Sequence, residues 1–176
     1  MLRGGGVIVK TMRSTPSPGD IVATAAQYKK GDARRGISPD GFDEVWAVFD
    51  WDERTANVTS ARRAANQTSV AVALSNPSFE VWLVWHFQEY MKIGCSASEV
   101  ERDLRAAWPR YRKGADADMK CLDRERFEVA RDRAVGADRI HEVEGRPYPE
   151  NRPSSGVHVL IEHLVTVSGE AGGPLG

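Results

Sequence analysis

The stretch that decides the fold is Val45-Trp46-Ala47-Val48-Phe49-Asp50-Trp51-Asp52-Glu53, in which five hydrophobic residues are followed by an acidic segment. A continuous apolar run of this length predicts a central strand that is covered on both faces, which is typical of a parallel sheet. Ligands of open parallel sheets gather at the carboxyl ends of the strands. The acidic residues therefore stand where a functional site is expected.

The residues on either side continue an alternation of strands and helices. Apolar runs predict strands at residues 7–9 and 70–74. Helical patterns predict one helix that ends near Lys30 and another at residues 54–67. This order indicates right-handed βαβ units, and so an α/β fold in which a mostly parallel sheet is flanked by helices.

The second half of the chain predicts helices and no obvious strand. One helix is expected to start with Asn76 as its N-cap and Pro77 in its first turn, and to reach about residue 90. Further helices are expected at 98–108, 118–135 and 157–167, the last one after the cap signal Pro153-Ser154-Ser155. We therefore expect a helical C-terminal half, a single domain over residues 1–167 and a disordered tail over 168–176.

Composition narrows the class of protein. The 176 residues, 41% hydrophobic and 28% charged, suit one globular core. The net charge is −1, so any contact with phosphates must be local. Cys95 and Cys121 have no CxxC partner, which predicts free thiols. No apolar run approaches the ~18 residues of a membrane span, so we expect no membrane contact and a cytoplasmic location.

Three carboxylates are candidates for chemistry. Asp50 and Asp52 are two residues apart, so in an extended segment both can offer oxygen ligands to one Mg²⁺ or Mn²⁺ ion. Alternatively, they cap the helix that begins near Arg54. Glu80 lies one place beyond the capping-box position if Asn76 is the N-cap, which leaves its carboxylate available. Its alternative role is to stabilise the positive end of that helix.

A mixed aromatic and basic run is a further candidate. Trp108, Tyr111 and Lys113 lie among several arginines, a combination that can stack on bases while contacting phosphates. The alternative is a solvated face with Trp108 packed inward, because nearby acidic residues dilute the positive charge.

Two motifs resemble the RloB-like family. They are FDEVWAVFDWDE at residues 42–53 and VALSNPSFEVWL at residues 72–83, the second followed by His86-Phe87. A looser similarity runs from about residue 7 to SSGVH at residues 154–158. Members of this family are associated with prokaryotic restriction and phage defence, and their core resembles the Toprim fold. The resemblance implies a Toprim/Rossmann-like, mostly parallel sheet.

The same resemblance implies a Mg²⁺-dependent nuclease that acts on DNA or RNA in phage defence. Asp50 and Asp52 would hold Mg²⁺ or Mn²⁺, and Glu80 would complete the catalytic set. The Toprim pattern also has a glutamate after its first strand, whereas no acidic residue precedes Asp20 here. Residues 7–9 match the second strand of the pattern, so we expect the first strand and its glutamate to be missing.

If residues 7–9 were instead the first strand, Lys10 would stand near the place of that glutamate. The missing glutamate leaves a second function open. In this alternative the chain is a catalytically degenerate interaction or regulatory subunit, whose partner is a protein of the same defence operon.

Overall fold

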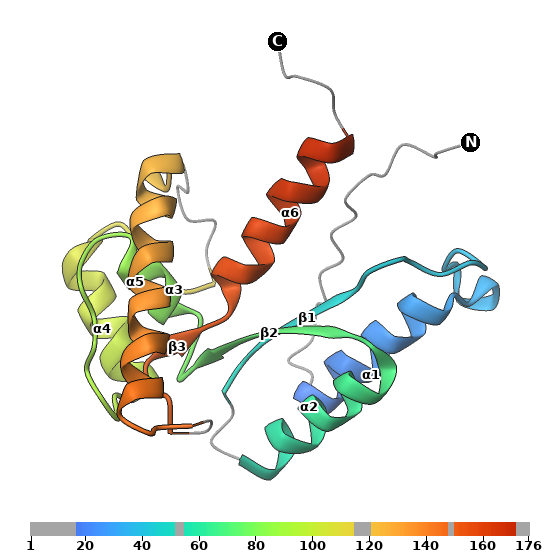
Figure 1. Ribbon diagram of the computed structural model, residues 1–176, viewed down its shortest axis with the longest axis horizontal. Helices are drawn as coiled ribbons and strands as arrows, with labels where there is room; N and C mark the ends of the chain where they lie inside the picture. The colour runs from blue at the N-terminus through green and yellow to red at the C-terminus, as the bar shows by residue number, and fades with distance from the viewer. Residues whose placement is uncertain (1–16, 52–54, 115–120, 148–149, 172–176) are drawn as a thin grey trace.

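The computed structural model describes residues 17–51, 55–114, 121–147 and 150–171. In these residues the sheet has three strands in the order β1 (Trp46–Asp50), β2 (Ala71–Asn76) and β3 (Ser154–Ser155). β1 and β2 are parallel, and Asp50 lies opposite Ser75; β3 is antiparallel to β2. The chain is therefore a mixed α/β protein with one parallel strand pair in the described part (Figure 1).

Two helices cover one face of β1 and β2. α1 (Pro18–Lys30) begins with a capping box between Ser17 and Asp20, and α2 (Thr55–Thr68) packs beside it below the strands in Figure 1. A short 3₁₀ helix, η1 (Ala33–Arg35), follows α1. Alternate residues of β1 face these helices and are buried, whereas Val48 is 44% exposed. The expected cover on both faces of this strand is therefore wrong at Val48. The first core comprises Val22, Ala25, Ala47, Phe49, Trp51, Val58, Ala61, Ala65 and Val70.

A second core lies in a helical unit at one end of the sheet. α3 (Glu80–Trp85), α4 (Ala97–Ala107) and α5 (Arg124–Val143) pack together on the left of Figure 1. All six residues of α3 are buried, and Trp85 is the largest fully buried side chain of the described part. The helical C-terminal half predicted from the sequence is confirmed by α4, α5 and α6 (Val157–Ala171).

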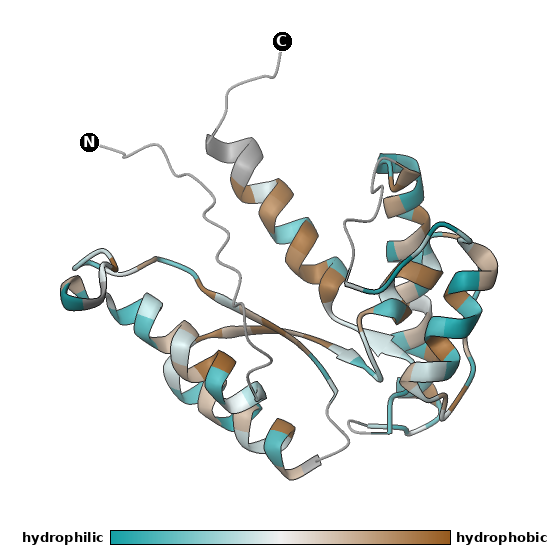
Figure 2. Cartoon of the chain, turned by 180° about the vertical axis from the view of Figure 1, so that it is seen from behind, coloured by the Kyte–Doolittle hydropathy of each residue, from teal (hydrophilic) through white to brown (hydrophobic). Residues whose placement is uncertain are grey.

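α6 lies on the other side of β1 and β2 from α1 and α2 (Figure 1). It contacts β2, and the ring of its His163 lies 5.7 Å from the ring of Trp46. Figure 2 shows that α6 is largely hydrophobic, although Val159 and Val165 are exposed. Within the described ranges, no helix is both long enough and apolar enough to cross a bilayer.

Several predicted elements differ from the observed ones. Asn76 is the last residue of β2 and not a helix cap, so α3 starts later and ends earlier than expected. The helix predicted at 118–135 is α5, Arg124–Val143. Ser154 and Ser155 form β3, where a cap was expected. α6 continues to Ala171, beyond the expected end at 167. The strand expected at residues 7–9 and the tail residues 172–176 lie outside the described part.

Candidate functional site

Asp50 and Glu80 meet where the two parallel strands end. Asp50 is the last residue of β1, and the next backbone N–H, of Trp51, donates to Ser75 O on β2 at 2.7 Å. The chain leaves β2 and turns into α3, which begins at Glu80. The Phe79 backbone N–H donates to Asp50 Oδ1 at 2.8 Å, which ties the start of α3 to the end of β1. Asp52 lies outside the described residues.

Glu80 is a buried carboxylate with one occupied oxygen. The residue is 3% exposed. Its Oε1 accepts a hydrogen bond from Tyr111 Oη at 2.8 Å and forms an ion pair with Lys113 Nζ at 3.0 Å. Its Oε2 is buried without a hydrogen-bond partner among the described residues, and so is Ser78 Oγ. A buried carboxylate oxygen without a partner is costly, so Oε2 has capacity for a ligand.

Burial and charge shift the pKa values of the two carboxyl groups in opposite directions. Burial, with the negative charge of Glu80 as the next cause, raises the pKa of Asp50 to about 6, although the Phe79 N–H and Lys113 oppose this shift. Burial also acts to raise the pKa of Glu80, but the polar groups of Ser78, Lys113 and Tyr111 outweigh it, and this pKa lies below its ordinary value. The hydroxyl group of Ser78 favours the charged form of Glu80. Glu80 is therefore the more strongly ionised of the pair.

Tyr111 and Lys113 were predicted for a different role. Tyr111 is 6% exposed, and its ring lies 5.7 Å from that of Trp108, which stacks on Phe87 at 5.3 Å. The base-stacking interpretation is therefore wrong for both aromatic rings, and the alternative in which Trp108 packs inward is confirmed. Sequence reasoning picked out this run of residues but missed its contact with Glu80, because the two segments are 31 residues apart.

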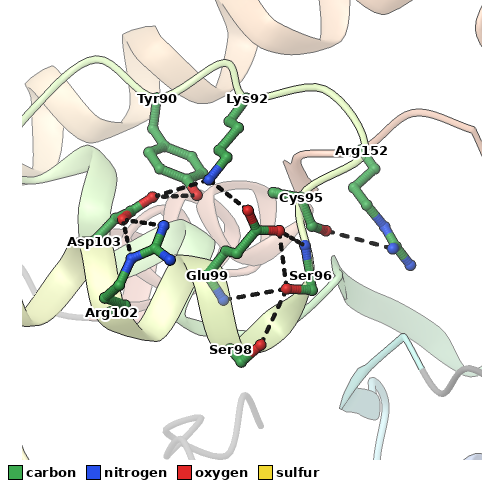
Figure 3. A network of polar contacts seen from close by, with 9 residues as sticks. All are labelled: Tyr90, Lys92, Cys95, Ser96, Ser98, Glu99, Arg102, Asp103 and Arg152. Carbon is green, nitrogen blue, oxygen red and sulfur yellow. Dashed lines mark hydrogen bonds and ion pairs between the residues drawn. The ribbon is translucent and has the colours of Figure 1, made fainter.

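A polar network joins α4 to the loop that precedes it (Figure 3). Ser96 and Glu99 form a capping box at the start of α4. Lys92 Nζ lies 2.6 Å from Glu99 Oε1 and 3.8 Å from Asp103 Oδ2, so the loop before α4 is paired with the helix. α4 also carries Glu101, whose Oε2 lies 4.0 Å from Lys113 Nζ. The network therefore anchors the start of α4 to the preceding loop.

Arg152 joins this loop to the end of β2. Its Nε donates to Asn76 Oδ1 at 2.8 Å. Its Nη1 donates to Cys95 O at 3.4 Å, as Figure 3 shows. The hydroxyl groups of Ser75 and Ser155 are hydrogen-bonded to each other at 2.9 Å. The polar residues where β2 ends thus support the strand end on which the site stands.

The chemistry of Asp50 and Glu80 fits a hard divalent cation. Two neighbouring carboxylates, one with an unpartnered buried oxygen, would both be stabilised by a positive ion. Mg²⁺ prefers oxygen ligands and often keeps several water molecules when one or two carboxylates bind it. The described residues hold no group of three or more His, Cys, Asp or Glu side chains placed for a metal. Asp52, which was expected to bind the metal together with Asp50, is outside them.

By its fold and its site, the chain is a mixed α/β protein with two neighbouring acidic residues where its parallel strands end. The family model described as RloB-like protein matches residues 5–164. The chain belongs to the RloB-like family, as the motifs at residues 42–53 and 72–83 indicated. Comparisons with curated proteins and with solved structures found no match.

The raised pKa of Asp50 predicts that this residue destabilises the metal-free protein at neutral pH. A carboxyl group with a raised folded-state pKa stabilises the fold only while it is protonated, so stability is lost as pH rises from about 4 to about 6. Asp50→Asn is therefore expected to raise the free energy of unfolding by about 1 kcal/mol at about pH 7. The effect is smaller than the full shift implies, because Asp50 still reaches solvent, which screens its charge. The amide oxygen can still accept from Phe79 N–H.

Urea unfolding of the two proteins at about pH 4 and about pH 7 measures this difference. The gain should be absent at the lower pH. An equal gain at both pH values would show that the ionisation of Asp50 is not its cause.

Proposed function

We propose that this protein is a metal-dependent phosphodiesterase that cleaves nucleic acid in phage defence, with Asp50, Asp52 and Glu80 as its catalytic carboxylates and Mg²⁺ or Mn²⁺ as its cofactor. The observation that carries the proposal is the pairing of Asp50 with a buried Glu80 that keeps one oxygen unpartnered. Membership of the RloB-like family supports the biological role and a Toprim-like core.

The contacts of each residue suggest its role in the proposed site. Asp50 and Glu80 would hold the cation, together with Asp52. When bound, the cation supplies positive charge that neutralises the nonbridging phosphate oxygens during cleavage. Tyr111 donates to Glu80 Oε1, which orients the carboxylate and leaves Oε2 available. The Phe79 N–H orients Asp50 in the same way through Oδ1.

A metal titration combined with a cleavage assay tests this proposal. Asp50→Asn removes a charged ligand and keeps the size of the side chain, so Mn²⁺ affinity and the cleavage of DNA or RNA should each fall at least about 100-fold. The matched control is Asp132→Asn, the same change at an exposed residue of α5 whose carboxylate pairs with Arg131. It should leave both measurements unchanged. Equal Mn²⁺ binding by wild type and Asp50→Asn would contradict the proposal.

A catalytically degenerate interaction subunit is the second candidate function. The observation that favours it is the ion pair between Lys113 and Glu80, which gives the buried carboxylate a counter-ion from the chain itself. In this case the protein would co-purify with a protein partner of its defence operon, and Mg²⁺ would change neither its stability nor its activity. Cleavage that depends on Asp50 would eliminate this alternative.

A further inference from the structure

Lys113 is a cationic side chain at the candidate metal site. Its Nζ lies 3.0 Å from Glu80 Oε1 and 4.0 Å from Glu101 Oε2, and its charge also acts on Asp50. An ammonium group therefore supplies positive charge to the same carboxylates that would hold the divalent cation. Two cations close to one carboxylate repel each other, so the ammonium and the metal compete for Glu80.

The two groups bound to Glu80 Oε1 differ in their freedom to leave. The Tyr111 ring is buried against Trp108, so its hydroxyl is held in place. The Lys113 side chain is 52% exposed and follows α4 in a segment outside regular secondary structure. Removing the counter-ion from a buried carboxylate is costly unless another cation replaces it, and a lysine has a long flexible stem with three donors. Lys113 can therefore turn away from Glu80 when another cation takes its place, while Tyr111 stays.

Three of the nearby arginines, Arg105, Arg112 and Arg152, are bound elsewhere. Arg112 Nη1 donates to the backbone carbonyls of Pro109 and Tyr111. Arg105 pairs with Glu101 at 2.6 Å, and Arg152 is bound to the end of β2 and the loop before α4. Each of these arginines would have to break the contacts just described before it could reach a substrate. Lys113 already has its charge at the carboxylates.

We propose that Lys113 binds the reacting phosphate of the substrate, and that the divalent cation takes its place on Glu80. This inference rests on the proposed function. A bound cation would neutralise Glu80, so the Lys113 ammonium would be free to contact the negative charge of a phosphate. A lysine binds phosphate as a point charge, so it can follow the group without a fixed two-point geometry. Lys113 is thus a counter-ion in the metal-free protein and a substrate ligand in the loaded protein.

The test compares three variants with wild type in two binding measurements. Lys113→Met keeps the apolar stem and removes the charge, Lys113→Arg keeps the charge, and Lys92→Met is the control. Lys92 also forms an ion pair with a glutamate, the half-exposed Glu99, in a network that does not include Glu80 (Figure 3). The first measurement is Mn²⁺ affinity by calorimetry without substrate. The second is binding of a short fluorescein-labelled oligonucleotide, as DNA and as RNA, in the presence of Ca²⁺.

Lys113→Met should bind Mn²⁺ about fivefold more tightly than wild type, because the competing ion pair is gone. It should bind the oligonucleotide about tenfold more weakly, and the salt dependence of binding should fall by about one ion. Lys113→Arg should restore oligonucleotide binding, and Lys92→Met should match wild type in both measurements.

The outcomes separate this inference from the function on which it rests. If wild type binds neither Mn²⁺ nor the oligonucleotide, the proposed function and the inference both fail. If wild type binds both and Lys113→Met weakens oligonucleotide binding no more than Lys92→Met does, only the role of Lys113 in phosphate binding is wrong. If Mn²⁺ affinity is the same in Lys113→Met and wild type, the proposal that the metal displaces Lys113 from Glu80 is wrong.

Discussion

Replacement of Trp85 with alanine is expected to lower the free energy of unfolding by about 3–5 kcal/mol, because it empties the largest fully buried site of the described core. Trp85 is 1% exposed, and its Nε1 donates to Tyr90 O at 2.9 Å. The substitution therefore removes apolar contacts and leaves a backbone carbonyl without its donor. Since Trp85 ends the helix that begins with Glu80, the candidate site should be lost at the same time.

Trp85→Phe is the matched control for this prediction. It keeps most of the buried area and loses the indole N–H, so it should cost about 1–2 kcal/mol. Urea unfolding followed by tryptophan fluorescence measures both variants. A cost below about 1 kcal/mol for Trp85→Ala would show that α3 is not held by this side chain.

Mg²⁺ is expected to stabilise the protein in a pH-dependent way. At about 100 times its Kd and at about pH 8, Mg²⁺ should raise the free energy of unfolding by about 2.7 kcal/mol. The gain should decline as pH falls through about 6, the pKa of Asp50 in the metal-free protein, because protons compete with the metal for the carboxylate. Below that pH, Kd should weaken about tenfold per pH unit, since one proton is released on binding.

Thermal or urea unfolding with and without Mg²⁺ over this pH range provides the measurement. Asp50→Asn should show no Mg²⁺ effect at any pH, whereas Asp132→Asn should behave as wild type does. Stabilisation by Mg²⁺ that persists unchanged at about pH 4 would place the ion on groups other than Asp50.

The local elements of the fold could be predicted from the sequence because their signals are local. The apolar runs of β1 and β2 and the periodic pattern and capping residues of α1 and α4 are short-range features. β3 was not predictable in this way. It has two serine residues, and only its pairing with Ser75 and Asn76 makes it a strand. The predicted start of α3 was wrong for a similar reason. Asn76 is buried at the end of β2, and its side chain is bound by Arg152, which lies 76 residues away in the sequence.

The same distinction between local signals and long-range contacts applies to the candidate site. Asp50 and Glu80 were predicted from their places after apolar runs, and the parallel register brings them together. The partners of Glu80 could not be assigned, because Tyr111 and Lys113 come from a loop whose position depends on the packing of α4 against α3. Asp52 stays a prediction, since it lies outside the described residues.

The two carboxylates belong to opposite sides of the boundary between the two cores. Asp50 ends a strand of the first core, and Glu80 begins a helix of the second. An ion held by both would tie the first core to the second, so that local opening of either one would require release of the ion. Metal binding would then slow amide hydrogen exchange in the interiors of α2 and α5 as well as at the ligands. The two cores would be mechanically coupled only in the metal-loaded protein.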